Sequence, residues 1–289
     1  MNNLRFSGHE TFHCRHFWIK KGVDFVAQNK DFKSDDAVVD LGVGKNMVSS
    51  INYWLQAFDL VKNSNNTELA EKIIYDLGFD PFLEDIGSIW LLHYKLLKND
   101  YSSIYKLIFN DFRKNRVSSE FTTKQVFDFI NRKLIQLNQN VSQNTLENDI
   151  KVFLRNYVSS NKKGDKNLED DLSSVFLSLN LISILPEIHE QGQQIYVIEY
   201  DNKLNLSPLI LLFAIKDIFD DEISISVNDI QLNVSDLFLC NREGTEDKLL
   251  KLQELGYLVY KEDAGRKEIQ FKDNRHKWDI LRDYYENNI

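Results

Sequence analysis

Residues 37–61, AVVDLGVGKNMVSSINYWLQAFDLV, place two apolar segments on either side of Gly42. We expect the first segment to form a short helix that ends in a left-handed turn at the glycine. A second helix over residues 45–58 would follow, with its apolar residues at helical spacing along one side. The residues expected to face the core are Ala37, Val38, Leu41, Val43, Val48, Ile51, Leu55 and Phe58. This pattern predicts a helix-turn-helix.

Polar side chains of the second helix would then point outward, where they suit the phosphates and base edges of a DNA major groove. The expected DNA contacts are Lys45, Asn46, Ser49, Ser50, Asn52 and Tyr53, with Lys20 and Lys21 from the basic N-terminal stretch. A helical hairpin used only for packing or protein contact is the alternative. An ATP-binding phosphate loop is not expected at Gly44-Lys45, because Val39 and Asn46 replace its glycine and hydroxyl residues.

Residues 9–13 spell H-E-x-x-H, the pattern of zinc peptidases. Zinc needs a third ligand and a helix that holds His9 and His13 on one face. Gly8 and the β-favouring run that follows disfavour such a helix, so we expect no zinc. Two other roles remain open for this stretch. His9 and Glu10 could form a buried turn or capping network, or they could join Arg15 and other polar groups in a functional site.

Residues 224–273 predict a second helix-turn-helix with a β-hairpin wing around Ala264-Gly265. Its exposed helix face carries several carboxylates, which favours a protein-docking role over DNA contact. We expect a mainly α fold: helical domains with winged helix-turn-helix modules and short β-hairpin wings. The expected domains are a helix-turn-helix domain at 1–116, a helical segment at 117–165 and a winged-helix domain at 166–289, with the flexible stretch 161–171 at the last boundary.

The chain of 289 residues has a formal net charge of −9, which argues against a non-specific coat on nucleic acid. The charge is uneven: residues 1–116 hold 15 Lys and Arg against 15 Asp and Glu, and the excess of carboxylates lies beyond them. No leader-like or membrane-spanning apolar run occurs, and Cys14 and Cys240 match no metal or disulfide spacing. We expect a cytoplasmic bacterial protein with both thiols reduced and no membrane partner.

Three motif stretches carry a resemblance to a known family. They are FSGHETF with Arg15, Trp18 and Lys21; LGVGKNMV with INYWLQAF; and DPFLED with WLLHY. Together they resemble the SspB-like family, which bears domain of unknown function 4007 and occurs in DNA phosphorothioation gene clusters. The resemblance is specific through about residues 4–116 and weaker beyond them. In that family the pattern includes His9, Glu10 and Arg15 but not His13.

The resemblance implies a role in bacterial DNA modification and anti-phage defence. Family members are described as DNA nickases that act beside a cysteine desulfurase, an ATPase and an ATP pyrophosphatase-like sulfur-transfer protein. The nick would open the strand whose phosphate oxygen sulfur replaces. The motif residues carried over are His9, Glu10 and Arg15, then Lys45 and Asn46, then Asp80, Glu84, Asp85 and His93. Which of them is catalytic does not follow from the match.

One hypothesis is that the protein binds double-stranded DNA and nicks it. His9 would act as a base, Arg15 as a phosphate clamp, and Glu10, Glu84 and Asp85 as ligands of a divalent cation such as Mg²⁺. Each residue also has a structural alternative: Glu84 and Asp85 could cap a helix, and His93 could be a core histidine. The competing hypotheses for the protein are a non-catalytic winged-helix adaptor that recruits sulfur-transfer enzymes, and a transcriptional regulator of its own gene cluster.

Overall fold

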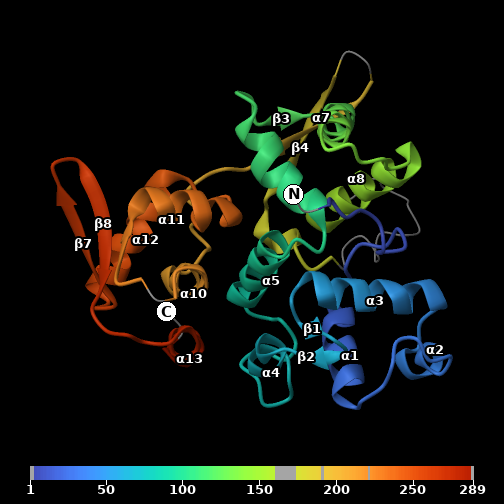
Figure 1. Cartoon of the computed structure of the whole chain (residues 1–289), viewed down its shortest axis with the longest axis horizontal. Coiled ribbons are helices and arrows are strands. Elements are labelled where there is room, and N and C mark those ends of the chain that lie inside the picture. The colour runs from blue at the N-terminus through green and yellow to red at the C-terminus, as the bar shows by residue number, and fades with distance from the viewer. Residues whose placement is uncertain (1–2, 160–173, 190–191, 221, 288–289) are drawn as a thin grey trace. The chain divides into compact units, whose positions relative to one another are not determined.

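The computed structural model describes residues 3–159, 174–189, 192–220 and 222–287. It is mainly α-helical with small antiparallel sheets, which confirms the expected class (Figure 1). The chain forms two compact units, one up to Glu199 and one from Tyr200. This division does not test the expected boundary after residue 116, because one compact unit can hold more than one folding domain. The expected boundary after residue 165 lies outside the described residues.

In the first unit, helices α2 (Ala37–Leu41) and α3 (Lys45–Ala57) lie on either side of the predicted turn. Gly42 has φ +61° and ends helix α2, as the sequence predicts. Of the residues expected to face the core, Val38 and Val43 are half-buried and the others are buried. Helix α1 packs on α3 at Gly22, where a Cβ would lie only 2.6 Å from Leu55. The elements here are α1 (His16–Ala27), α2 (Ala37–Leu41), α3 (Lys45–Ala57), β1 (Val61–Lys62), β2 (Asn65–Asn66) and α4 (Glu68–Ile73).

The rest of the first unit surrounds helix α5, in which every residue from Gly87 to Leu97 is buried. A cluster of aromatic rings, including Tyr105, Phe153 and Tyr157, joins α8 to this core. Strand β5 pairs with both β3 and β4. The elements are α5 (Ile86–Lys98), α6 (Ser103–Lys106), the π-helical segment η1 (Leu107–Phe112), β3 (Glu120–Phe121), α7 (Thr123–Gln136), α8 (Gln143–Tyr157), the 3₁₀ segment η2 (Leu177–Leu179), β4 (Ile182–Ile188) and β5 (Gln194–Ile198).

The second unit is built around α10, whose residues Leu209–Lys216 are all buried. Helices α12 and α13 pack on it, and Ser207 caps its start as predicted. The hairpin β7–β8 turns at Ala264-Gly265, both with positive φ, as the sequence predicts. The elements are α10 (Pro208–Ile218), β6 (Ser224–Ser226), α11 (Val227–Asn233), the 3₁₀ segment η3 (Ser235–Phe238), α12 (Arg242–Glu254), β7 (Leu258–Asp263), β8 (Arg266–Phe271) and α13 (Lys277–Asn287).

The structure also bears on the two cysteines and on possible membrane spans. Cys14 and Cys240 are both free and buried. Within the described ranges, no helix has the length and apolar character needed to span a membrane.

Candidate functional site

The fold brings the three motif stretches together around residues 7–16. Gly8 lies against the Tyr53 ring of α3, where a Cβ would come within 2.8 Å of a ring carbon. The Trp54 indole N–H, also on α3, donates to the Phe12 carbonyl over 3.2 Å. The His16 ring donates to the Phe82 carbonyl, in the third motif, over 2.7 Å. The first motif therefore contacts both of the others.

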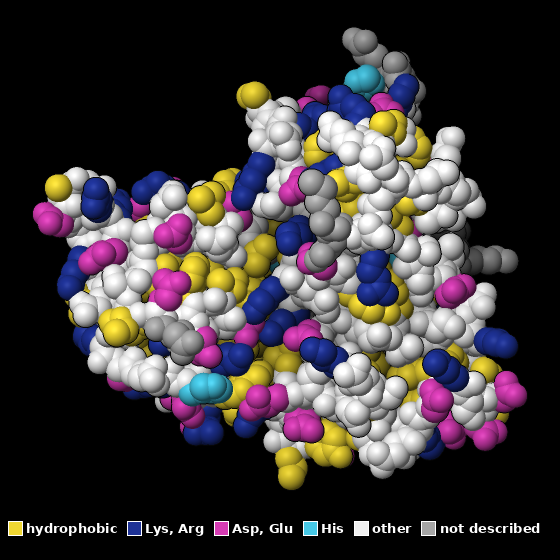
Figure 2. All heavy atoms as spheres, in the orientation of Figure 1, with side chains coloured by type: hydrophobic (Ala, Val, Ile, Leu, Met, Phe, Trp, Pro, Cys, Tyr) yellow, Lys and Arg dark blue, Asp and Glu magenta, His cyan; other side chains and the backbone are white. Residues whose placement is uncertain are grey.

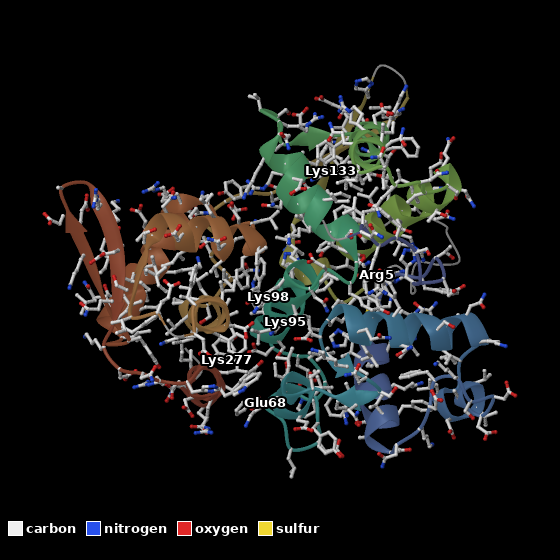
Figure 3. The ribbon with its side chains drawn as sticks, viewed as in Figure 1. Arg5, Glu68, Lys95, Lys98, Lys133 and Lys277 are labelled. Atoms are coloured by element: carbon white, nitrogen blue, oxygen red, sulfur yellow. The ribbon has the colours of Figure 1, made fainter. Side chains whose placement is uncertain are left out.

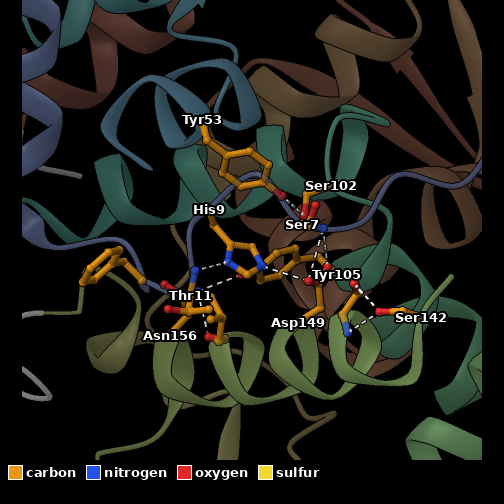
Figure 4. Close-up of polar contacts among 12 residues, drawn as sticks. Ser7, His9, Thr11, Tyr53, Ser102, Tyr105, Ser142, Asp149 and Asn156 are labelled. Atoms are coloured by element: carbon orange, nitrogen blue, oxygen red, sulfur yellow. Dashed lines mark hydrogen bonds and ion pairs between the residues drawn. The ribbon is translucent and has the colours of Figure 1, made fainter. Parts of the chain in front are cut away.

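A buried histidine–aspartate pair fixes the first motif to helix α8 (Figure 4). His9 Nε2 lies 3.1 Å from Asp149 Oδ1, and the two side chains are 3% and 1% exposed. The Ser7 backbone N–H donates to both Asp149 oxygens, over 3.2 and 3.0 Å. The Thr11 backbone N–H donates to His9 Nδ1 over 3.2 Å. The backbone at Ser7 is thus bonded directly to the Asp149 carboxylate, and the backbone at Thr11 is linked to it through the His9 ring.

These contacts assign the two ring nitrogens of His9. Nδ1 accepts a hydrogen bond, so the ring proton must lie on Nε2 and point at Asp149. Both nitrogens are therefore occupied within the fold. For His9 this geometry fits the sequence alternative of a buried turn network, but Glu10, the other residue of that alternative, is exposed. His13 is also buried, but residues 9–13 form no helix, so the arrangement that H-E-x-x-H has in zinc peptidases is absent here.

A second set of hydrogen bonds extends this network along α8. The Asn156 amide accepts from the Cys14 N–H over 3.1 Å and donates to the Tyr105 hydroxyl over 2.7 Å. The Tyr53 hydroxyl donates to Ser102 over 2.6 Å, as Figure 4 shows. Burial raises the pKa of Tyr53, and it raises the pKa of Tyr105 well above its usual value. The Tyr53 side chain is buried and its hydroxyl is bonded within the fold, so the geometry assigns Tyr53 to the core.

The remaining residues of the first motif reach the surface. Glu10 is exposed and has a positive φ of +48°. Arg15 is half-buried, and its guanidinium carbon lies 5.0 Å from the centre of the Trp18 ring. Of the three residues predicted from this motif, Glu10 and Arg15 are thus the ones that a ligand in solution could meet.

Carboxylates of the third motif organise the start of helix α5. Asp80 is buried and accepts from the Glu84 and Asp85 N–H groups, over 2.9 and 3.0 Å, and from the Ser88 hydroxyl over 2.5 Å. Asp85 caps α5 by accepting from the Gly87 N–H over 2.7 Å. His93 is a core histidine whose ring lies 3.0 Å from the Tyr157 hydroxyl. Glu84 alone of the predicted acidic residues in this motif is exposed.

The predicted DNA-binding face of α3 is only partly exposed. Lys45, Asn46 and Ser49 point to solvent, and Asn52 is half-buried with its side-chain oxygen bonded to Gln56. The expected outward direction of Ser50 and Tyr53 is wrong, because both side chains are buried. For Tyr53 the cause is the first motif: Gly8 lies against its ring and Phe12 is bonded to the neighbouring Trp54, so the buried arc of α3 is wider than apolar spacing predicts. The amines of Lys20 and Lys21 bind other groups within the unit: Asp24 and Asp76 hold Lys20, and the Leu41 carbonyl holds Lys21.

A family model described as "Protein of unknown function (DUF4007)" matches residues 6–285. The chain belongs to the DUF4007 family. Two solved structures are similar over its whole length. One, described as "SspB crystal structure", has a TM-score of 0.82 and 25% sequence identity, and the match covers 99% of this chain and 89% of that chain. The other, described as "Magnesium ion-bound SspB crystal structure", has a TM-score of 0.83 and 24% identity with the same coverage. A search of curated proteins found no similar sequence.

Sequence reasoning missed two residues of this site, Asp149 and Asn156. Both lie on the buried side of α8 among Leu146, Phe153 and Tyr157. A carboxylate and an amide at apolar positions of an amphipathic helix are a signal of buried hydrogen-bond partners. The sequence alone therefore marks Asp149 and Asn156 as residues that need buried partners. Their partners lie about 140 residues away, at His9 and Cys14, and no local pattern identifies them.

The DUF4007 chain offers no preformed cluster for a metal in the part that the structure describes. No three His, Cys, Asp or Glu side chains lie together there in a way that could hold an ion. Asp80 and Asp85 already accept from backbone N–H groups. The exposed carboxylates left in the motif stretches are Glu10 and Glu84.

Proposed function

We propose that this protein binds double-stranded DNA as part of a DNA phosphorothioation system and nicks one strand so that sulfur can be incorporated. Family membership and whole-chain likeness to structures described as SspB support the system. Its proposed protein partners are the cysteine desulfurase, the ATPase and the ATP pyrophosphatase-like protein of such a system. Its proposed location is the bacterial cytoplasm.

The observation that carries DNA binding is the N-terminus of α3. Gly44 precedes this 13-residue helix and no side chain caps it. The first N–H groups of a helix lack partners within it and attract phosphate oxygens. Lys45 and Asn46 are exposed at this end, and among the described residues the Lys45 amine has no carboxylate partner. A phosphate would meet the helix end and one cation together.

We infer that both helix-turn-helix segments are winged. In the first, α2 and α3 are followed by the short β1–β2 hairpin. In the second, α11 and α12 are followed by β7 and β8, and β6 completes a sheet in the order β6-β8-β7. Glu246 on α12 is bound by Arg242 and Lys267. Glu243 and Asp247 are exposed on the same helix, where carboxylates would repel DNA phosphates. We therefore assign DNA to the first module and a protein partner to the second.

The proposed nicking step uses the exposed residues of the motif stretches. Arg15 would bind the scissile phosphate through its forked N–H groups. Mg²⁺ is often held by one or two carboxylates together with phosphate oxygens, so Glu10 and Glu84 are the residues that would hold it once DNA is bound. Magnesium would stabilise charge on the reacting phosphate. Asp149 would hold His9 and the loop that carries Glu10 and Arg15 in place.

A non-catalytic DNA-binding adaptor is the second candidate. It is favoured by the engagement of both His9 nitrogens, which leaves the predicted base without a free lone pair. It is also favoured by the use of Asp80 and Asp85 as caps.

One set of assays separates the two functions. Supercoiled plasmid is incubated with the protein with and without Mg²⁺, and duplex binding is measured by fluorescence anisotropy at several salt concentrations. Lys45→Ala should weaken binding equally for different sequences and lower the salt slope by about 0.9, as the loss of one phosphate contact predicts. Lys151→Ala removes an exposed lysine of α8 and is the control.

Conversion to open circles that needs Mg²⁺ and is lost in Glu84→Gln and Arg15→Ala supports the nickase. Duplex binding that depends on Lys45 without any nicking supports the adaptor. If Lys45→Ala changes neither affinity nor salt slope, the α3 N-terminus is not the DNA-binding surface.

A further inference from the structure

A basic pocket outside the three motif stretches lies between α7 and the segment that follows η1. It encloses about 730 Å³, within the range typical of small-ligand sites. Three cations line it, Arg116, Arg132 and Lys133, against one carboxylate, Asp128, in a chain whose net charge is −9. Figure 3 labels Lys133 beside α7, and Figure 2 shows Lys and Arg side chains interspersed with Asp and Glu side chains over this face of the molecule. The local excess of cations favours an anionic ligand.

The cations of this pocket are incompletely neutralised. Arg116 has no carboxylate partner among the described residues; its Nη2 donates to the Glu120 carbonyl over 2.9 Å, and its buried Nε has no hydrogen-bond partner. Arg132 lines the pocket with an exposed side chain whose Nε donates to a carbonyl of its own helix. Lys133 forms an ion pair with Asp111. Burial lowers the pKa of both Arg116 and Lys133, and a bound anion would oppose that effect.

An aromatic ring and several amides share the pocket with these cations. Phe129 lines it and is half-buried, and the Lys133 amine lies 5.9 Å from the centre of its ring. Its ring is held edge-on against Phe112, with centroids 5.3 Å apart, and the Arg116 guanidinium carbon lies 4.9 Å from the Phe112 ring centre. Amides of Asn131 and Gln136 also line the pocket, and amides can pair with base edges. Phosphate-binding cations, a base-sized ring and amides are the components of a nucleotide site.

We propose that this pocket binds a nucleotide unit, with its phosphate on Arg132 and Arg116 and its base stacked on Phe129. The unit could come from an unpaired DNA strand or from a free mononucleotide. A stacked base and a phosphate are the chemistry common to both. This site uses none of the residues assigned to duplex binding or nicking.

Fluorescence anisotropy of the full chain with a labelled 12-nucleotide oligothymidylate tests the proposal, with unlabelled dTMP as competitor. Phe129→Leu keeps an apolar side chain against Phe112 and should weaken binding about tenfold, within the range for loss of one stacked base. Arg132→Ala should weaken it similarly and lower the single-strand salt slope by about 0.7. Lys124→Ala, an exposed cation of the same helix outside the pocket lining, should change affinity less than about twofold.

If dTMP competes at concentrations near its own dissociation constant, the site is assigned to free nucleotides. If dTMP fails to compete, the site is assigned to unpaired DNA strands. Either result supports the nucleotide chemistry, provided that Phe129→Leu and Arg132→Ala weaken binding and circular dichroism shows both variants folded. Equal affinities of these variants and wild type overturn the proposal, as does the absence of any binding. Duplex binding and nicking should be unchanged in both variants. A failure of the proposed function would therefore not change the outcome of this test.

Discussion

Asp149 is a single buried carboxylate on which two groups of the first motif depend, the Ser7 N–H and the His9 ring. Both donors would lose their partner in Asp149→Ala. We expect that change to lower the free energy of unfolding by about 3 kcal/mol, since each unsatisfied buried donor costs about 1–3 kcal/mol. Asp149→Asn keeps one acceptor oxygen and should cost less. Equilibrium unfolding in urea measures both.

Glu147→Ala removes a more accessible carboxylate from the same helix and should shift stability by less than about 0.5 kcal/mol. If Asp149→Ala is no more destabilising than this control, the buried network does not hold the first motif.

Residue identities could be predicted where the cause is local. Asp85 as a possible cap and His93 as a core histidine follow from their neighbours in sequence, and the structure places both so. The pairing of His9 with Asp149 depends on chain segments 140 residues apart. Nothing in the spacing of either segment specifies the other, so the sequence predicted the need for a partner without naming it.

Gly42 and Gly44 offer a matched test of the turn between α2 and α3. A Cβ added at either position would meet nothing within 4 Å, but Gly42 has φ +61° and Gly44 has φ −67°. Gly42→Ala should therefore lower the free energy of unfolding by about 1 kcal/mol, because an L-residue resists the left-handed conformation. Gly44→Ser, which places a favoured capping residue directly before α3, should be neutral or slightly stabilising, by up to about 0.5 kcal/mol. Thermal and urea unfolding of both variants measure the difference.

Equal effects of the two substitutions would contradict a left-handed turn at residue 42. The turn itself was predictable, since a glycine between two apolar helical patterns has few other uses. The buried arc of α3 was not. Helical spacing gives the apolar side, but Ser50 and Tyr53 are buried as well, Tyr53 against the loop that precedes α1, and nothing in the spacing of α3 predicts such a cover.

At the scale of the whole molecule, each compact unit has its own core. In the second unit, α10 is covered by α12 and α13, and the Phe213 and Trp278 rings lie 5.3 Å apart. We expect residues 200–289 expressed alone to fold and to unfold cooperatively in urea, as domains with their own core do. Residues 200–276, which lack α13, should show no cooperative transition. A gradual, non-cooperative loss of helical circular dichroism in the longer fragment would contradict an independent unit.

No side of helix α10 faces water, because every residue from Leu209 to Lys216 is buried. During synthesis it leaves the ribosome well before Lys277–Asn287, the segment that forms α13. In that interval a strongly apolar helix has no completed core to enter, and exposed apolar surface of this kind promotes aggregation. The first unit has by then all of its residues and can fold. The speed of translation between residues 218 and 277 should therefore affect the yield of soluble protein, and chaperones that bind apolar segments should act in this window.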